Sequence, residues 1–448
     1  MKSPLASRRG FLKTSAASAL VAAAIPSVFA AEDNTLRVAL VGCGGRGTGA
    51  AAQALATAAQ GPIKLVAMAD IFENKLKGSF ASLQKRGAQF DVPQERTFLG
   101  FDAYRKAMDC LKPNDIVILT TPCAFRWVHF TCAIEKGLNV FMEKPLTVDG
   151  PTTRRMIKLA EDADAKNLKC GVGLMVRHCK GRQALKKRLE DGEMGDILHM
   201  RAYRMGGRAA WAYRRPNDTL SDAMFQTRSF HSFLWSGGGL FSDYNIHQID
   251  ECSWMKGAWP VKAHATGGRH FKGESLDQNF DNYYVEYSFP DGTRFTFNAR
   301  YMDNCPGEFA SYAVGSKGSC IISTSSHTPG RVRLFSDYNM SPAKMTWAFP
   351  QPEPNPYQTE WDDLVRAIRS NTPYNEVKRG AEASLVTSMG RMAAHTGQLI
   401  TFDQMLKSDH EYAPDVDKMT PDAPAPLKAG PDGKYPIPNP GVNTKREY

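Results

Sequence analysis

The sequence lacks several features that mark common classes of protein. It has no internal repeat, no low-complexity block, and no apolar run of the roughly 20 residues that a membrane span requires. It also has no long basic run or interleaved aromatic–basic pattern, which argues against nucleic-acid binding although the formal net charge is +10. The nine cysteines form no CxxC pair, so a zinc ribbon or a thioredoxin-type motif is excluded. What remains is the composition of a globular protein, with 42% apolar and 23% charged residues.

Residues 1–31 have the three parts of an export signal. SRRGFLK at 7–13 resembles the twin-arginine signature, an Ala-rich apolar stretch follows, and VFA at 28–30 places small residues before a cut near Ala30. The apolar stretch is too short for a membrane anchor, and the alternative is an ordinary apolar helix. Because the twin-arginine machinery carries folded proteins, we expect a periplasmic or otherwise exported protein with mostly reduced, buried cysteines.

A glycine-rich loop follows the first apolar run of the mature chain. LRVALV at 36–41 is typical of a strand buried in a parallel sheet, and an Ala-rich helical stretch follows the loop. Between them lie Gly42, Gly44 and Gly47, the spacing that allows a tight turn, close approach to a pyrophosphate and close packing of helix on strand. This context predicts a dinucleotide-binding loop rather than an ordinary glycine-rich turn.

A second strand, IKLVAMAD, ends at Asp70. An acidic residue at this point can accept hydrogen bonds from both ribose hydroxyls of NAD and would repel the 2′-phosphate of NADP. Neither Ile71 nor Phe72 supplies the cation that NADP favours, so NAD is the predicted cofactor and NADP is disfavoured. The alternative is an exposed Asp at a strand end.

Strands and helices continue to alternate after Asp70. DIVILTTP reads as a strand that ends at Thr121 and Pro122, the next segment as a helix that carries His129, and LNVFME as another strand. This rhythm predicts an α/β fold with a doubly wound parallel sheet, whose ligands bind at the carboxyl ends of the strands. The tripeptide EKP at 143–145 falls at that edge.

A second polar group lies on a predicted helix. Asp243, His247 and Asp250 are spaced i, i+4, i+7 and therefore share one helix face, with apolar Leu240 and Ile246 beside it. This pattern favours a helix that presents polar groups to a closed pocket. The alternatives are a capped amphipathic helix and a metal site, but further ligands are not evident and no metal is predicted.

Together these motifs resemble the Gfo/Idh/MocA family, named for glucose–fructose oxidoreductase and inositol dehydrogenase. The resemblance covers roughly residues 35 to 400 and includes GCGGRG, Asp70, TTP with His129, GLNVFMEKPLTVD and GGGLFSDYNIHQID. It implies an amino-terminal Rossmann domain (35–155) and a carboxyl-terminal α/β domain (156–405) with a large open, mostly antiparallel sheet. That sheet mediates oligomer contacts in many members, so a homo-oligomer, either dimer or tetramer, is expected. The usual substrates are sugars and cyclitols.

The resemblance also assigns roles to residues. It implies that Lys144 and His247 serve hydride transfer as base and as oxyanion stabiliser, with Asp243 or Asp250 binding hydroxyls or orienting the imidazole. Which of Lys144 and His247 is the principal base stays open at this point. The implied cofactor contacts are Gly42, Gly44, Arg46, Gly47, Asp70, Thr121, Pro122, His129, Glu143 and Lys144.

The segment from Val176 to Arg215 is strongly basic. Most of that charge is typical of a solvated helix face, but Arg204 and Arg208 with the neighbouring Trp211 could form a pocket wall. This favours an anionic or amino-modified sugar as substrate. The predicted substrate contacts are Arg177, Arg204, Arg208, Trp211 and Tyr244. The Pro-rich segment 412–448 is predicted to be an extended or disordered tail.

The predicted function is that of an exported NAD-dependent oxidoreductase acting on a sugar or cyclitol. Outside the cytoplasm no pool replaces NADH, so the dinucleotide should travel tightly bound and be restored in each cycle. One alternative is a redox-neutral NAD-dependent glycosidase, whose members depart from EKP, a tripeptide intact here. Another is a non-catalytic sugar-binding protein, which should have lost Lys144 or His247.

Overall fold

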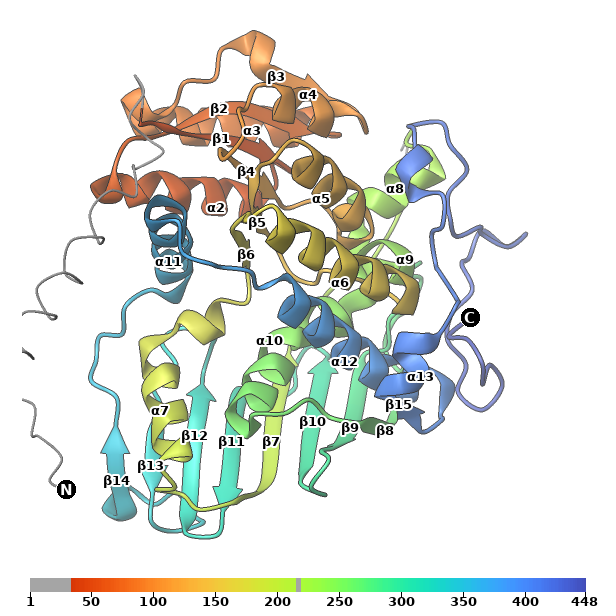
Figure 1. The fold of residues 1–448 in the computed structure, drawn as a ribbon. Helices are drawn as coiled ribbons and strands as arrows, with labels where there is room; N and C mark the ends of the chain where they lie inside the picture. The colour runs from red at the N-terminus through yellow and green to blue at the C-terminus, as the bar shows by residue number, and fades with distance from the viewer. Residues whose placement is uncertain (1–33, 215–218) are drawn as a thin grey trace, which may run out of the picture. The chain divides into compact units, whose positions relative to one another are not determined.

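The computed structural model describes residues 34–214 and 219–448, which form two β-sheets and the helices around them (Figure 1). The predicted export signal and its cleavage site lie outside the described residues. Within the described ranges, no helix has both the length and the apolar composition needed to cross a membrane.

The first sheet has six parallel strands in the order β3-β2-β1-β4-β5-β6. Its strands are β1 (Leu36–Val41), β2 (Ile63–Asp70), β3 (Thr97–Leu99), β4 (Ile116–Leu119), β5 (Asn139–Met142) and β6 (Cys170–Val172). The helices between them are α2 (Gly45–Leu55), α3 (Glu73–Leu83), α4 (Ala103–Asp109), α5 (Arg126–Glu135) and α6 (Gly150–Ala165). The order reverses between β1 and β4, which is the switch point where open α/β sheets bind ligands. The predicted Rossmann arrangement is confirmed.

The strands of this sheet are apolar on both faces because helices cover both. Every residue of β4 and β5 is buried, as is all of β1 except Arg37. The sheet extends beyond residue 155, where the sequence analysis ended the first domain. The helix α6 is a crossover connection that leads into β6, and β6 pairs in parallel with β5.

The second sheet has nine strands in the order β14-β13-β12-β11-β7-β10-β9-β8-β15. Only the central pair, β7 and β10, is parallel, so the sheet is mostly antiparallel as expected. The strands are β7 (Ile197–Gly206), β8 (Lys262–Gly268), β9 (Asn282–Ser288), β10 (Arg294–Tyr301), β11 (Glu308–Gly315), β12 (Gly318–Thr324), β13 (Arg333–Phe335), β14 (Met345–Ala348) and β15 (Ile400–Thr401).

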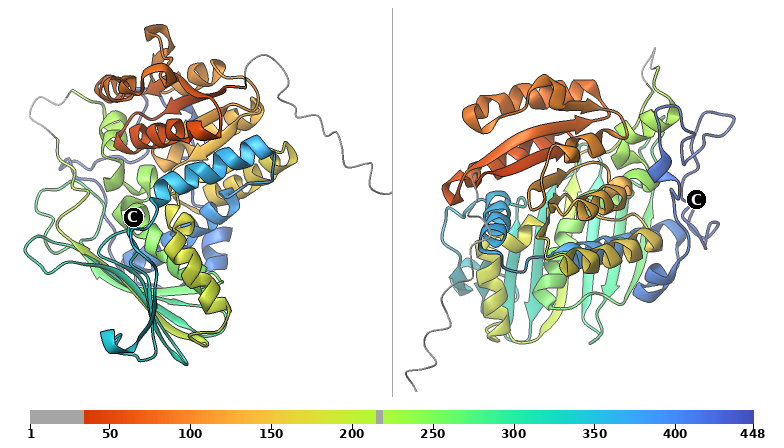
Figure 2. Two further views of the ribbon diagram at one scale, coloured as in Figure 1. Left: turned by 90° about the vertical axis from the view of Figure 1, so that its left-hand side faces the viewer. Right: turned by 45° about the horizontal axis from the view of Figure 1, so that its top comes forward.

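Helices cover one face of this second sheet. The helices in this part of the chain are α7 (Lys180–Glu190), α8 (Asp222–Arg228), α9 (Leu234–Gly237), α10 (Gly239–Lys256), α11 (Pro356–Ser370), α12 (Val377–Thr396) and α13 (Phe402–Lys407). Of these, α7, α10 and α12 supply buried side chains to the core beneath the second sheet. In β10, Phe295, Phe297 and Tyr301 alternate with more exposed residues and point into the core, as a strand covered on one face requires. The helices α10 and α12 pack over the sheet, and α6 lies beside α12 (Figures 1 and 2).

Two late segments pack against earlier parts of the chain. Trp361 of α11 is fully buried and its ring stacks on Phe141 of β5 at 4.4 Å, so α11 covers a face of the first sheet. Residues 412–448 contain no strand and only one 3₁₀ turn, η8 (Val416–Lys418). This tail is extended and packed: Leu427, Tyr435 and Glu447 are buried.

Candidate active site

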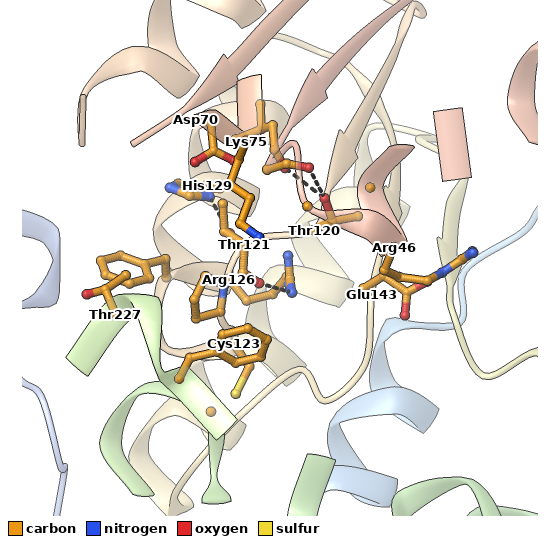
Figure 3. Close-up of a pocket in the computed structure, with 18 of the residues that line it drawn as sticks. Arg46, Asp70, Lys75, Thr120, Thr121, Cys123, Arg126, His129, Glu143 and Thr227 are labelled. Atoms are coloured by element: carbon orange, nitrogen blue, oxygen red, sulfur yellow. Dashed lines mark hydrogen bonds and ion pairs between the residues drawn. The ribbon is translucent and has the colours of Figure 1, made fainter. Parts of the chain in front are cut away.

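A cavity of about 560 Å³ lies at the carboxyl ends of the parallel strands. The loops after β1, β2, β4 and β5 line one part of it (Figure 3). The start of α10, the turn η6 (Phe230–Ser232) and the loop after β12 line the rest. The cavity therefore joins the first sheet to the elements that cover the second.

The glycine loop has the shape that a pyrophosphate needs. Gly42 has φ +100°, and a Cβ there would lie 2.8 Å from the carbonyl carbon of Thr120. A Cβ at Gly47 would collide with the carbonyl oxygen of Gly42. At Gly44, by contrast, a Cβ would meet only open space, so this backbone is accessible from the cavity, and α2 begins directly after it. The residues present thus fit the diphosphate of a dinucleotide at the amino end of a helix.

Asp70 lies at the end of β2, where the adenosine ribose of a dinucleotide would be held. Its Oδ2 accepts a hydrogen bond from the amide of Cys43 at 2.6 Å, and its Oδ1 accepts one from the amide of Phe72 at 2.8 Å. Burial raises the pKa of Asp70 and these amides oppose that effect. Lys75 of α3 also lines the cavity here, a cation that the sequence analysis did not consider (Figure 3).

The predicted contacts after β4 are brought to the cavity. Thr121, Pro122 and His129 all line it, and the Thr121 hydroxyl lies 3.1 Å from His129 Nδ1. Burial and the nearby charge of Arg126 lower the pKa of His129 to about 3. His129 is therefore a neutral wall residue rather than a charged contact.

Arg46 and Glu143, predicted as cofactor contacts, pair with each other. Arg46 Nε lies 2.5 Å from Glu143 Oε1, and its Nη2 lies 3.5 Å from the buried Glu360. Figure 3 labels Arg46 and Glu143 side by side. Burial and the charge of Glu143 raise the pKa of Glu360 well above its usual range. This pair joins the glycine loop to the EKP segment.

The predicted catalytic residues Lys144 and Asp243 meet in the cavity. Lys144 Nζ donates to the backbone oxygen of Asp243 at 2.6 Å and lies 3.2 Å from its Oδ1. The other carboxylate oxygen lies 2.8 Å from Nδ1 of His231. Burial disfavours the carboxylate, but the charges of Lys144 and His231 outweigh it and lower the pKa of Asp243.

His247 lies one helical turn beyond Asp243 and also lines the cavity. Burial, the adjacent His327 and the charges of Lys144 and Arg204 lower its pKa well below the usual range, so it is neutral at neutral pH. Its Nδ1 has no hydrogen-bond partner among the residues that the structure describes. The ring of His327 lies 4.2 Å away, centroid to centroid.

Several predicted residues do not line this cavity. Asp250 is fully buried behind it and forms a bidentate ion pair with Arg177, the shortest distance being 2.6 Å. The helix turns Asp250 toward the core, so neither residue is placed for catalysis or substrate contact, contrary to the sequence analysis. Arg208 pairs with Asp303 at the surface and lies over the ring of Trp211, which removes both from the predicted pocket wall.

The two remaining predicted substrate contacts lie just behind the cavity wall. The ring of Tyr244 lies 5.5 Å from that of His231, and Arg204 Nη1 lies 3.3 Å from Nε2 of His327. The sequence analysis missed His231, His327 and Tyr357, all of which line the cavity. His231 is near the helix motif in sequence and could have been suspected, whereas His327 comes from a loop with no motif.

A buried arginine links the two segments that carry Lys144 and Asp243. Arg391 of α12 donates to the backbone oxygens of Gly238 at 2.8 Å and Val148 at 3.2 Å. Its charge is balanced by Glu447 of the tail, with both Arg391 Nε and Nη2 at 2.9 Å from that carboxylate. The guanidinium therefore fixes the start of α10 relative to the segment after Lys144.

One cysteine, Cys123, lines the cavity. All nine cysteines are unpaired thiols and seven are buried, in agreement with the expectation from sequence. Among residues 34–214 and 219–448, no group of three or more His, Cys, Asp or Glu side chains could hold a metal ion.

Comparison with known proteins agrees with this geometry. Residues 36–173 match the model of the oxidoreductase family with an NAD-binding Rossmann fold, and residues 182–321 match the GFO/IDH/MocA C-terminal domain. Among curated relatives, an inositol 2-dehydrogenase of Corynebacterium glutamicum is 26% identical over 36% of this chain and 41% of its own length. A scyllo-inositol 2-dehydrogenase (NAD(+)) of Bacillus subtilis is 23% identical over 48% and 56%, respectively. The matched segments thus span about half the length of these relatives.

Solved structures share the fold over a longer stretch. The aldose-aldose oxidoreductase of Caulobacter crescentus has a TM-score of 0.61 at 18% identity, covering 82% of this chain and 99% of its own. A levoglucosan dehydrogenase in complex with NADH and levoglucosan has a TM-score of 0.60 at 17% identity, covering 83% and 100%. With both family models matched in order along more than half of the sequence, this chain belongs to the Gfo/Idh/MocA family of NAD-binding oxidoreductases.

Proposed function

We propose that this protein transfers hydride between NAD and a hydroxyl-bearing carbon of a sugar or cyclitol. The observation that carries this proposal is the single cavity that joins the glycine loop and Asp70 to Lys144, Asp243 and His247. Bound NAD would supply the ring that accepts the hydride. Relatives named as inositol dehydrogenases and a levoglucosan dehydrogenase support this substrate class.

The proton of the substrate hydroxyl goes to His247 in this proposal. His247 is neutral because burial and neighbouring positive charge lower its pKa, so it can accept a proton at neutral pH. The ammonium group of Lys144, held by the backbone oxygen and Oδ1 of Asp243, is positioned to stabilise negative charge on the substrate oxygen. Between the two bases that the sequence left open, this proposal takes His247.

We also propose that the protein is exported by the twin-arginine machinery with its NAD already bound, and that each catalytic cycle restores the cofactor. The motif SRRGFLK at 7–13 supports export, and the family's open sheet supports a homo-oligomer. Two substrates used in turn would close the redox cycle.

The first test is the nucleotide content of the exported, signal-cleaved protein. Denaturation should release about one NAD(H) and little NADP(H) per chain if the cofactor travels bound. A protein that releases no nucleotide would contradict export with NAD bound, and it would favour the non-catalytic sugar-binding alternative.

The second test separates the chemical alternatives. Formation of bound NADH with a free sugar or cyclitol is the expected result. Release of nitrophenol from a chromogenic glycoside would instead favour the redox-neutral glycosidase. Thermal stabilisation by sugars without either reaction would favour binding alone.

A further inference from the structure

Arg204 occupies an unusual place in the second sheet. It belongs to β7, on the same face as Met200 and Ala202, because residues two apart in a strand share a face. Both of those neighbours are fully buried beneath the helices. An arginine at the end of this face therefore points its charge toward the interior, where it lies behind His327 of the cavity wall.

This guanidinium has no acidic partner. Among residues 34–214 and 219–448, no carboxylate lies within ion-pair distance of Arg204. Its contacts are the ring of Phe309, 3.8 Å from Cζ to the centroid, the ring of Tyr244 at 5.7 Å, and Nε2 of His327 at 3.3 Å. Burial lowers the pKa of Arg204. A half-buried positive charge without a counterion is unfavourable unless an anion completes the site.

The carboxylate that acts on the charge of Arg204, that of Asp243, is already paired with other cationic groups. Asp243 attracts Arg204 from within the site, yet its carboxylate is held by Lys144 and His231. This leaves one uncompensated positive charge on this side of the cavity.

His327 connects that charge to the reaction centre. Its ring lines the cavity and lies 4.2 Å from His247. If Arg204 donates to Nε2 of His327, the proton of the neutral imidazole is on Nδ1, which is then free to donate to a ligand. Burial and the charge of Arg204 lower the pKa of His327 well below its usual range, so the ring adds a donor but no charge.

We propose that His327, backed by the positive charge of Arg204, forms a subsite for a carboxylate on the substrate, so that the protein acts on a sugar acid in preference to a neutral sugar. This inference rests on the proposed function and specifies its substrate. One net positive charge behind one imidazole N–H donor matches a carboxylate, whereas a phosphate carries nearly twice the charge. Arg208 and Trp211 have no part in the subsite.

The test compares sugar acids with the matching neutral sugars. D-glucuronate and D-galacturonate are measured against D-glucose, D-galactose and glucose 6-phosphate, by ligand-induced thermal stabilisation and by NADH formation. The variants are Arg204→Gln and Arg204→Lys. The matched control is Arg201→Gln, an arginine on the opposite face of the same strand that also lies over an aromatic ring, that of Tyr312 at 4.7 Å.

The wild type and Arg201→Gln should prefer an acid over the matching neutral sugar. Arg204→Gln should lose roughly 10- to 100-fold in apparent affinity for the acid and little for the neutral sugar. Arg204→Lys should recover part of the loss, because it restores the charge without the planar fork.

Equal use of acid and neutral sugars by the wild type, with the same ratio in Arg204→Gln, would overturn the carboxylate subsite and leave the proposed function intact. A preference for glucose 6-phosphate would also overturn it. No NADH with any sugar, together with acid-specific stabilisation that Arg204→Gln removes, would refute hydride transfer but support the subsite.

Discussion

The side chain of Lys144 contacts both the backbone and the side chain of Asp243: its Nζ lies 2.6 Å from the carbonyl oxygen and 3.2 Å from Oδ1. This double contact joins the loop after β5 to the first turns of α10. Lys144 therefore supplies a positive charge to the site and also connects a loop of the first sheet to a helix that covers the second.

Replacing Lys144 should slow turnover strongly without releasing the cofactor. We expect Lys144→Met to lower the rate of hydride transfer by about 100- to 10,000-fold, the usual effect of losing a positioned proton-transfer or charge-stabilising group. Nucleotide content should stay near the wild-type value. The control is Lys158→Met, a lysine exposed on α6. Equal loss of NAD and activity would show that Lys144 acts through cofactor binding.

The pH dependence of turnover should report the neutral state of His247. Because burial and nearby positive charges lower its pKa, the imidazole stays unprotonated well below the ordinary histidine range. The acid limb of the rate profile should therefore lie below about pH 6.5. His247→Gln should lower the rate and remove that limb. A limb at or above about pH 6.5 in the wild type would contradict this role.

Asp70 should decide between the two dinucleotides. We expect Asp70→Ser to weaken NAD binding and to reduce the preference for NAD over NADP by roughly 10- to 100-fold, since one charge-assisted interaction and one repulsion are lost. Nearby Lys75 should strengthen this shift by attracting the 2′-phosphate. Fluorescence titration of the nucleotide-free protein measures both affinities, with the exposed Asp91→Ala as control. If the ratio of the NAD and NADP affinities did not change, the adenosine ribose would not be bound at Asp70.

His178 should make stability fall in alkaline solution. It lies 2.8 Å from Asp363 and 3.1 Å from Glu376, and although burial opposes the charged form, these acids raise its pKa to about 9. A raised pKa stabilises the fold fully below the unfolded value of about 6.5, and that contribution disappears as the pH rises through about 9. Urea unfolding between about pH 6 and pH 10 should show a larger loss for the wild type than for His178→Gln. If the wild type and His178→Gln lost the same stability between these pH values, the raised pKa of His178 would be refuted.

Glu447 should stabilise the whole fold through Arg391. Glu447→Gln leaves Arg391 buried without its counterion, so we expect a loss of about 3–5 kcal/mol in the free energy of unfolding. The control is Glu411→Gln, which breaks the more exposed pair with Arg155 and should cost at most about 1 kcal/mol. If Glu447→Gln lost as little stability as the control variant, packing alone would hold the tail.

Much of the fold followed from local patterns. The apolar runs and the glycine spacing predicted the first sheet because each strand and its following loop are contiguous in sequence. The sequence did not show that α11 covers this sheet, because Trp361 and Phe141 meet only through the fold. The predicted boundary of the first domain at residue 155 differs from the end of the sheet, because α6 leads into one more parallel strand, β6.

The candidate site was predictable where its residues belong to motifs. Lys144, Asp243 and His247 lie together as the resemblance implied. The prediction that Asp250 lines the pocket was wrong. Helical spacing shows that residues share a face, but it does not show how far along that face the pocket extends, and the carboxylate of Asp250 pairs with Arg177 in the core. His327 lies on a loop between two strands, and its position depends on long-range strand pairing that no local pattern encodes.

The Arg391–Glu447 pair has a consequence for the order of events during synthesis. The nucleotide loop leaves the ribosome early, yet the link that holds the start of α10 against the segment after Lys144 needs residue 447. A nascent chain can therefore form its first sheet long before the reaction centre is rigid. We therefore expect the cavity to become rigid, and to hold a nucleotide stably, only after nearly all the residues described here have been translated.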